Sequence, residues 1–274
     1  MSGLGELRHE PTAKRIRAQL GEATVVDSTR AALVWEPRRV VPRYAVPVED
    51  VRAELTPAGR SAGGHRGGWV FHSRAVLASR ARPVDSVRRA HRRRRGRRRT
   101  GNWADPRGRR VPPSDPALNG YVVLDFDAFD TWYEEDEVNL GHPRDPFHRI
   151  DILASSRHIR LELDGVLLGD SSRPMLLFDT MLATRYYLPR EDVRAELIPS
   201  PTRTVCAYKG QASYLSPTVG DQPVPDLAWT YPDPQREASE VRGLVSCFDE
   251  RVDVVLDRTR VERPMTPWSA GPGR

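Results

Sequence analysis

The chain has 274 residues, of which 38% are hydrophobic and 29% charged, enough for one large domain or two small ones. It has no run of about 18 apolar residues, so we expect no membrane-spanning segment and no membrane partner. The N-terminal stretch lacks the apolar core of a signal peptide, which favours a cytoplasmic protein. Two cysteines, Cys206 and Cys247, are too few for a disulfide-rich scaffold or a four-thiolate zinc site.

An arginine-rich segment at residues 57–112 carries much of the positive charge. It holds 17 arginines and two acidic residues, whereas the rest of the chain has 26 basic and 35 acidic residues. Its densest part, Arg88–Arg99, contains nine arginines in twelve residues. Like charges at this density repel one another and little apolar surface is available for burial, so the composition predicts disorder.

Two interpretations of this segment stay open. A polybasic arm would neutralise phosphates, and nucleic acid is expected as a partner only through Arg88–Arg99, if that run is a genuine functional segment. Alternatively the stretch is a frame-disturbed or drifting linker, because 41 of the 43 basic residues are arginine, a bias typical of a GC-rich coding sequence. We favour the linker, since aromatic stacking residues are not interleaved with the arginines.

Two parts of the chain resemble each other over a long stretch. RYAVPVEDVRAELTP at residues 43–57 returns as RYYLPREDVRAELIP at residues 185–199, an offset of 142 positions. The further matches are Ile16–Leu20 with Ile159–Leu163 and Val26–Glu36 with Gly169–Asp179, both at an offset of 143, and more weakly Gly120–Glu135 with Gly243–Asp257. Agreement of this length predicts a tandem duplication.

The two predicted copies differ in completeness. We expect a degenerate first copy at residues 14–137, interrupted by the arginine-rich segment, and an intact second copy at residues 156–257. Residues 138–155 are expected to link the copies, and residues 258–274 to form a disordered tail. The first copy lacks a match to the middle of the second, so it should be the weaker fold.

Each copy is predicted to be mainly β, a small antiparallel domain with one or two short helices. Residues 159–163 alternate apolar and polar side chains, and Asp164-Gly165 favours a type I′ turn into the next strand. The sequence Pro189–Leu197 is typical of one short helix with proline in its first turn. The other predicted strands are Val166–Leu168, Pro174–Asp179, Ser213–Pro217, Leu227–Tyr231, Gly243–Phe248 and Val252–Leu256.

The middle of the second copy gathers the side chains best suited to chemistry. Lys209 is one of only two lysines, and it could contact an anion or, if desolvated, act as a nucleophile. Cys206 could be a thiolate beside it, and Arg185 could clamp a carboxylate or phosphate. The candidate ligand-binding residues are Arg185, Cys206, Tyr208, Lys209, Ser213, Tyr214, Trp229 and Tyr231.

Each candidate also has a structural interpretation. A lone cysteine on a strand is usually a small buried hydrophobe, and the histidine nearest to Cys206 in the sequence is the distant His158. Aromatic residues on short strands usually pack, and Lys209 suits an exposed turn. Two functions of different class therefore stay open. One is a pocket for a small anionic or aromatic ligand; the other is a non-catalytic structural or interaction module.

Three motifs carry a resemblance to a known family. CAYKGQASY at residues 206–214, WTYPDP at residues 229–234 and RYYLPREDVRAEL at residues 185–197 resemble the domain-of-unknown-function family 427. Asp249 and Val252-Asp253 fit that family's Asp-x-Val-Asp piece. WYEEDE and GHPRDPFHRID resemble the join in two-copy actinobacterial members. The resemblance implies a fold of β-tent type and no firm activity.

A nucleotidyltransferase-like label attached to this family implies carboxylates that hold two magnesium ions. The chain has Gly-Asp-Ser-Ser at residues 169–172 without a matching Asp-x-Asp on the following strand. His142, His148 and His158 match no common metal-ligand spacing. We therefore expect no metal and no cofactor, and the sequence leaves enzymatic activity open.

Overall fold

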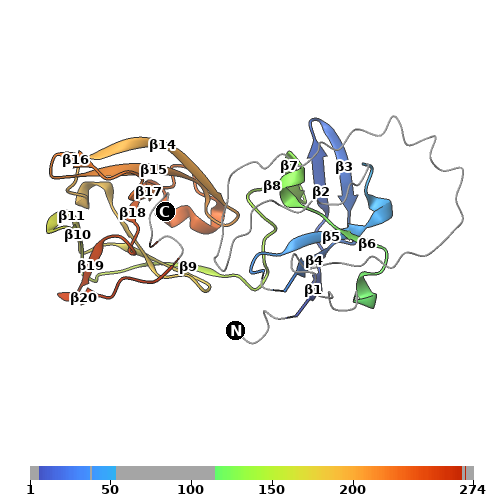
Figure 1. Cartoon of the computed structure of the whole chain (residues 1–274), viewed down its shortest axis with the longest axis horizontal. Coiled ribbons are helices and arrows are strands. Elements are labelled where there is room, and N and C mark those ends of the chain that lie inside the picture. Colours follow the sequence, from blue (N-terminus) through green and yellow to red (C-terminus); the bar gives the residue numbers. More distant parts are fainter. Residues whose placement is uncertain (1–5, 38, 54–114, 267–268, 270–274) are drawn as a thin grey trace, which may run out of the picture. The chain divides into compact units, whose positions relative to one another are not determined.

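The computed structural model describes residues 6–37, 39–53, 115–266 and 269. They form two compact units, the first ending at Asp145 and the second beginning at Pro146 (Figure 1). Both units consist of antiparallel strands joined by short turns and single 3₁₀ turns, which confirms the prediction of a mainly β protein. The arginine-rich segment at residues 57–112, with its predicted disorder, lies outside the described residues.

The first unit contains two four-stranded sheets. In order across the first sheet the strands are β1 (Arg8–Pro11), β4 (Ala32–Trp35), β5 (Arg43–Pro47) and β6 (Tyr121–Val123). The second sheet is ordered β3 (Ala23–Ser28), β2 (Ile16–Leu20), β7 (Thr131–Glu134) and β8 (Glu137–Asn139). The 3₁₀ turns are η1 (Val48–Asp50), η3 (Pro116–Leu118) and η4 (Phe126–Ala128). Alternating side chains bring Ile16, Tyr44 and Trp132 into one buried core.

The second unit has a similar small sheet and a larger one. The small sheet is ordered β11 (Val166–Ser171), β10 (Ile159–Leu163), β19 (Asp253–Leu256) and β20 (Thr259–Val261). The larger sheet is ordered β14 (Leu197–Cys206), β15 (Gly210–Val219), β17 (Ala228–Thr230), β18 (Val245–Cys247), β13 (Arg185–Leu188), β12 (Met175–Asp179) and β9 (Ile150–Ala154), with β16 (Gln222–Pro223) on β15. Its 3₁₀ elements are η5 (Arg190–Asp192) and η6 (Arg236–Val241).

The strand pairing follows one pattern in both units. Ile16 lies opposite Ser28 in the β2–β3 pair, and Ile159 lies opposite Ser171 in the β10–β11 pair, an offset of 143 at both ends. Each pair has a register shift after the third residue of its first strand. The β1–β4 and β9–β12 pairs show the same offset of 143 at both ends. The neighbours β7 and β19 of these strands correspond at an offset of 122, and β5–β6 corresponds to β13–β18 at offsets of 142 and 123.

A shared side-chain contact accompanies the shared pairing. Ser28 Oγ donates a hydrogen bond to Asp50 in η1, and Ser171 Oγ donates one to Asp192 in η5, both at 2.7 Å. In each unit a proline precedes a single 3₁₀ turn: Pro47, the last residue of β5, precedes η1, and Pro189, the residue after β13, precedes η5. Proline fixes φ near the value that such a turn needs.

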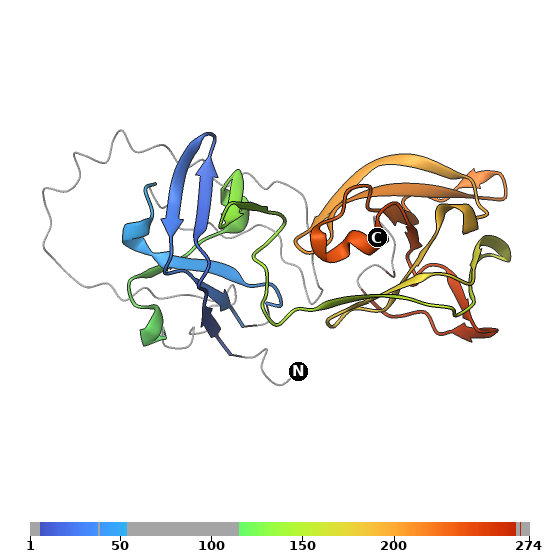
Figure 2. The same ribbon diagram turned by 180° about the vertical axis from the view of Figure 1, so that it is seen from behind.

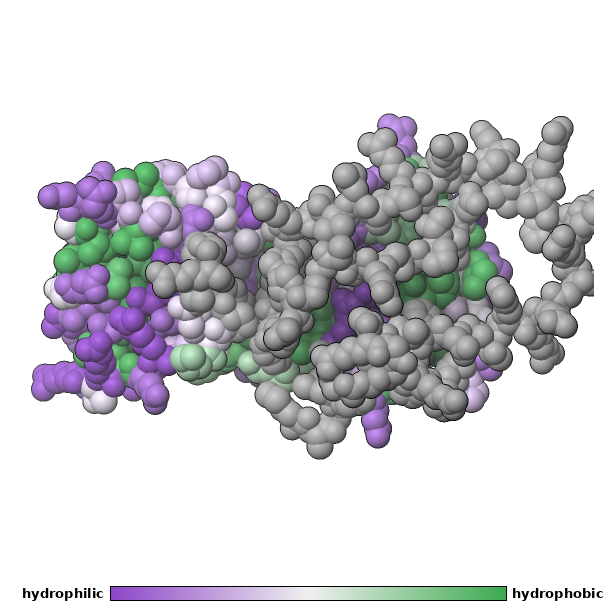
Figure 3. Space-filling view, viewed as in Figure 1, coloured by the Kyte–Doolittle hydropathy of each residue, from purple (hydrophilic) through white to green (hydrophobic). Residues whose placement is uncertain are grey.

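The long hairpin of β14 and β15 distinguishes the second unit. It arches across that unit with η6 beneath one end (Figure 2). Ala238 and Val241 of η6 are buried against the aromatic residues of the larger sheet. Hydrophobic and hydrophilic side chains are mixed over the face of the second unit in view in Figure 3. Among the described residues of the first unit, β14 to β17 have no counterpart.

The predicted strands of the second copy are present, and Asp164 and Gly165 both have positive φ (51° and 80°), as a type I′ turn requires. The prediction of a helix at Pro189–Leu197 is wrong, because only the 3₁₀ turn η5 forms there. Val193 leaves the helical region with φ −82° and ψ 126° and forms a bridge to Gly169 of β11. Pairing with a strand therefore satisfies the backbone groups that a helix would have used.

Five strands of the second unit lie where the sequence predicted none: β9, β13, β14, β16 and β20. Residues 150–154, expected to be part of the linker, form β9, and residues 259–261, expected to be part of the tail, form β20. Residues 197–206 form β14 although the segment contains two prolines. The register shift between Pro199 and Arg203 accommodates them, because β14 is the edge strand of its sheet and a missing N–H there breaks no essential ladder.

Candidate functional site

Most of the predicted site residues lie on one face of the larger sheet. Tyr187 and Trp229 lie in one buried cluster on this face, together with Tyr231 and the partly buried Tyr214. Trp229 is paired with Tyr214 on β15, and its Nε1 donates a 3.0 Å hydrogen bond to Tyr187 Oη. Ser213 lies between the inward-facing Ala212 and Tyr214, so alternation directs it to the opposite face.

Lys209 is in the turn between β14 and β15, and its ammonium group is bound to a carboxylate. Lys209 Nζ donates a short hydrogen bond to Asp179 Oδ2 at the end of β12. His148 Nε2 lies 2.5 Å from the other oxygen of the same carboxylate, and the His148 ring stacks on Tyr208 with centroids 4.3 Å apart. Lys209, for which an exposed turn was the structural alternative to ligand binding, is therefore the cationic half of a buried ion pair.

The electrostatics of this group keep its charges fixed. Burial alone would lower the pKa of Lys209, but the neighbouring Cys206, Asp179 and Tyr187 hold it above its ordinary value. Burial opposes ionisation of Asp179, yet His148 and Lys209 keep the pKa of that carboxyl below its usual range. Lys209 is consequently a charged ion-pair partner and not the neutral amine that a nucleophile requires.

Burial also keeps the phenols of this face protonated. It raises the pKa of Tyr187 to about 12 and that of Tyr231 well above its ordinary value. Cys206, at the end of β14, is half-buried.

Arg185 is buried on β13 and is also paired. Its two terminal nitrogens donate to the Glu250 carboxylate at 2.8 and 2.7 Å, and Thr266 Oγ1 donates to the same group at 2.6 Å. The guanidinium carbon lies 5.7 Å from the centre of the Trp229 ring. This bidentate pair and the aromatic contact satisfy Arg185 without a bound anion.

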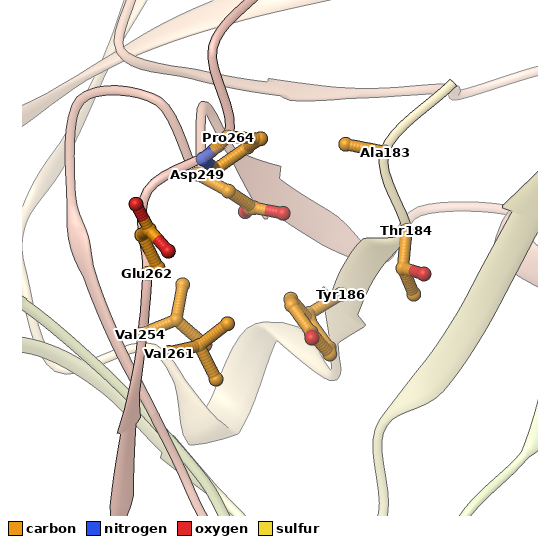
Figure 4. Close-up of a pocket in the computed structure, with 8 residues that line it drawn as sticks. All are labelled: Ala183, Thr184, Tyr186, Asp249, Val254, Val261, Glu262 and Pro264. Atoms are coloured by element: carbon orange, nitrogen blue, oxygen red, sulfur yellow. The ribbon is translucent and has the colours of Figure 1, made fainter. Parts of the chain in front are cut away.

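A pocket opens in the second unit on the other side of Arg185. Its free volume is about 160 Å³, and the Asp249 carboxylate extends into the space enclosed by Val254, Val261 and Tyr186 (Figure 4). The residues that line it are Ala183, Thr184, Tyr186, Asp249, Val254, Val261, Glu262 and Pro264. None of the eight residues predicted as ligand-binding is among them.

Asp249 is the polar residue that sets the character of this pocket. It is 4% exposed, its Oδ2 lies 3.7 Å from Arg185 Nη1, and its Oδ1 accepts no hydrogen bond from any described residue. Burial, together with the nearby Glu250 charge, raises the pKa of Asp249 to about 7, although Arg185 opposes the shift. A carboxyl with that pKa can gain or lose a proton near neutral pH.

The first unit fills the corresponding place with aromatic rings. Val254 lies opposite Leu161, and Trp132 holds the same position opposite Ala18. Val123 and Ser246 are equivalent positions, because Val123 pairs with Ala45 and Ser246 pairs with its counterpart Tyr187. Phe126 and Asp249 each lie three residues further along, so Phe126 corresponds to Asp249. The Trp132 ring stacks on Phe126 at 5.2 Å and lies 5.1 Å from Tyr44, the counterpart of Tyr186.

Sequence reasoning identified Asp249 only as part of a motif and missed the rest of the pocket. The contrast of Asp249 with Phe126, and of Val254 with Trp132, follows from the strand registers of the structure. The predicted histidines have separate partners, with His158 Nε2 2.7 Å from Asp170 and His148 beside Asp179. Within the described ranges, no three His, Cys, Asp or Glu side chains are placed to hold a metal ion.

Comparison with known proteins shows a similarity within the second unit. No curated protein matches the chain. Across the described residues, no helix has the length and apolar character needed to cross a membrane. One family model matches residues 151–258, which include Asp249 and Val254 of the pocket and the motifs around Lys209. The family of this model is described as a domain of unknown function (DUF427), and residues 151–258 are similar to it.

Proposed function

We propose that the second unit binds a small organic ligand in the pocket beside Asp249, and that the first unit is a duplicated copy without such a pocket. The observation that carries this proposal is the contrast at one register position. Val254 leaves a space of about 160 Å³ in the second unit, whereas Trp132 stands at the same position in the first.

Duplication is supported by the pairing pattern of the strands. Independent evolution of two sheets would not be expected to reproduce the same offset of 143, the same register shift and the same serine–aspartate contact. The two-copy architecture also explains why the first unit keeps its strands although an aromatic cluster occupies the place of the pocket.

The size and walls of the pocket limit the ligand. Pockets for drug-sized molecules are usually about 300–1,000 Å³, so this one suits a molecule of a few heavy atoms or the end of a larger one. Val254, Val261 and Pro264 supply apolar wall, and Asp249 and Glu262 supply polar ends.

The face around Lys209 supports a different role. Lys209 and Arg185, the two cations on which an anionic ligand would depend, are each neutralised by a buried carboxylate. Removing one member of such a pair leaves an uncompensated charge, which gives these residues a function in stability. The structural interpretation of the cluster is therefore favoured for that face.

The test uses three probes of one size, n-butylammonium, butyramide and butyrate, with binding to the full chain measured by ligand-observed NMR. The Val254→Trp variant places the ring of the first unit in the pocket, and Thr259→Trp places the same ring at an exposed position of the neighbouring β20. We expect a binding signal from at least one probe with the wild type and Thr259→Trp, and its loss with Val254→Trp. Equal binding to Val254→Trp, or no binding of any probe at millimolar concentration, would refute the proposal.

A further inference from the structure

The charges around the pocket select among small ligands. Arg185 donates hydrogen bonds to both oxygens of Glu250, so the Glu250 carboxylate already neutralises its positive charge when Asp249 ionises. Glu262 adds a second carboxylate to the lining, and none of the described residues that line the pocket is a lysine, arginine or histidine. An anion entering here would meet two acidic groups and no free cation.

We propose that the pocket is a receptor for the protonated amino group of a small organic molecule, with Asp249 Oδ1 as the acceptor of its hydrogen bond. This inference rests on the proposed function and names the ligand class. Asp249 Oδ1 is buried and accepts no hydrogen bond from the described residues, so an N–H donor would satisfy an atom that is otherwise costly to bury. The Tyr186 phenol and Thr184 hydroxyl border the same space.

The walls favour an organic cation over a metal ion. Calcium binds six to eight oxygen ligands and magnesium keeps an octahedral shell of about six, whereas the pocket has two carboxylates and is otherwise largely apolar. The alkyl part of an amine would bury its apolar surface against Val254, Val261 and Pro264, and this burial favours binding. Ammonium and alkyl groups in one molecule therefore match both parts of the lining.

Binding should be linked to protonation of Asp249. The titratable groups around this carboxyl are Arg185 and Tyr186 from β13, Cys247 from β18, Glu250 beside it in the chain, and Glu262 from the segment after β20. Since the pKa of Asp249 is about 7, ionisation precedes ammonium binding and one proton is released. The affinity for an alkylammonium ion should rise about tenfold between pH 6 and pH 8, because the ionised fraction rises by that factor.

The experiment titrates n-butylammonium, butyramide and butyrate into the full chain at pH 6 and pH 8. Asp249→Asn removes the charge and keeps the shape, and Glu240→Gln, an exposed residue of η6, is the control for an equal change of net charge. We expect butylammonium to bind at least tenfold more tightly than butyramide at pH 8. Asp249→Asn should abolish that preference while leaving butyramide binding in place, and Glu240→Gln should change neither.

Several results would overturn the inference. If butyramide or butyrate binds as tightly as butylammonium, the pocket is a ligand site but not an amine receptor, and the proposed function stands alone. If calcium chloride at equal concentration displaces butylammonium and binds more tightly, the site is a metal site. If no probe binds, the proposed function fails together with the inference.

Discussion

Trp132 and Val254 hold the same register position in the two units, Trp132 opposite Ala18 and Val254 opposite Leu161. Trp132 is 2% exposed and contacts Phe126, Phe129 and Tyr44, so its ring is part of the core of the first unit. The same strand position therefore serves packing in one unit and leaves a space in the other.

Trp132→Val should destabilise the first unit strongly. The substitution removes a buried ring and leaves a cavity, for which large-to-small changes of tryptophan cost about 3–5 kcal/mol. Urea unfolding followed by hydrogen–deuterium exchange of peptides from β2 and β7 measures the loss. Peptides from β10 and β19 of the second unit serve as the internal reference, and similar destabilisation of both sets would contradict a local packing role.

Asp249→Asn should stabilise the second unit at alkaline pH. The pKa of Asp249 is about 7 in the folded state and near 3.8 in the unfolded chain, so the folded state holds the proton more tightly. The stability of the wild type therefore falls as pH rises between these values and is constant above the upper one. From pH 5 to pH 8 the wild type should lose about 3 kcal/mol relative to Asp249→Asn. Parallel pH profiles of the two proteins in urea unfolding would show that Asp249 is not the linked group.

Lys209→Met should destabilise the second unit although it keeps the length of the side chain. Asp179 would remain buried beside His148 without its lysine, and breaking a buried pair costs about 3–5 kcal/mol. The exposed pair of Arg149 and Asp151 gives the matched control, since Arg149→Met should cost less than about 1 kcal/mol. Equal effects in thermal unfolding would mean that burial adds nothing to the Lys209 pair.

Arg185→Lys should be costly despite the conserved charge. The planar guanidinium donates to both oxygens of Glu250, and an ammonium group cannot reproduce this geometry. We expect a loss of about 1–3 kcal/mol in the free energy of unfolding. Arg173→Lys, at an exposed contact with Glu191 and Asp192, should change it much less, and the reverse order in thermal unfolding would contradict this account.

Local pattern was enough to predict much of the strand arrangement. Alternation at residues 159–163 and the Asp164-Gly165 turn depend on neighbouring residues only, so the sequence indicated that hairpin correctly. Pro189–Leu197 has the local features of a helix start, yet a long-range bridge between Val193 and Gly169 decides its conformation. Tertiary pairing overrides propensity in such short segments.

The site was harder to predict because its contacts join distant segments. Asp179 lies thirty residues before Lys209, and nothing local in the sequence identifies it as the lysine's partner. The pocket depends on Tyr186 of β13 meeting the segment around Asp249 and the strands that follow. Residue types alone favoured the cluster around Lys209 and Trp229. The strand pairing instead places the Asp249 carboxylate in a pocket that none of those predicted residues lines.

The pairing of β13 with β18, and of β5 with β6, has one more consequence. The two strands of each pair are neighbours in their sheet although a long stretch of chain separates them in the sequence. In the second unit this stretch forms β14 to β17, which extend the sheet beyond β18. Loop-closure entropy grows only slowly with length, so the β5–β6 junction of the first unit should tolerate an insertion, whereas in the second unit the intervening stretch supplies core residues such as Leu215 and Trp229. The β5–β6 junction is therefore a natural grafting point for foreign peptides in engineered variants of the domain.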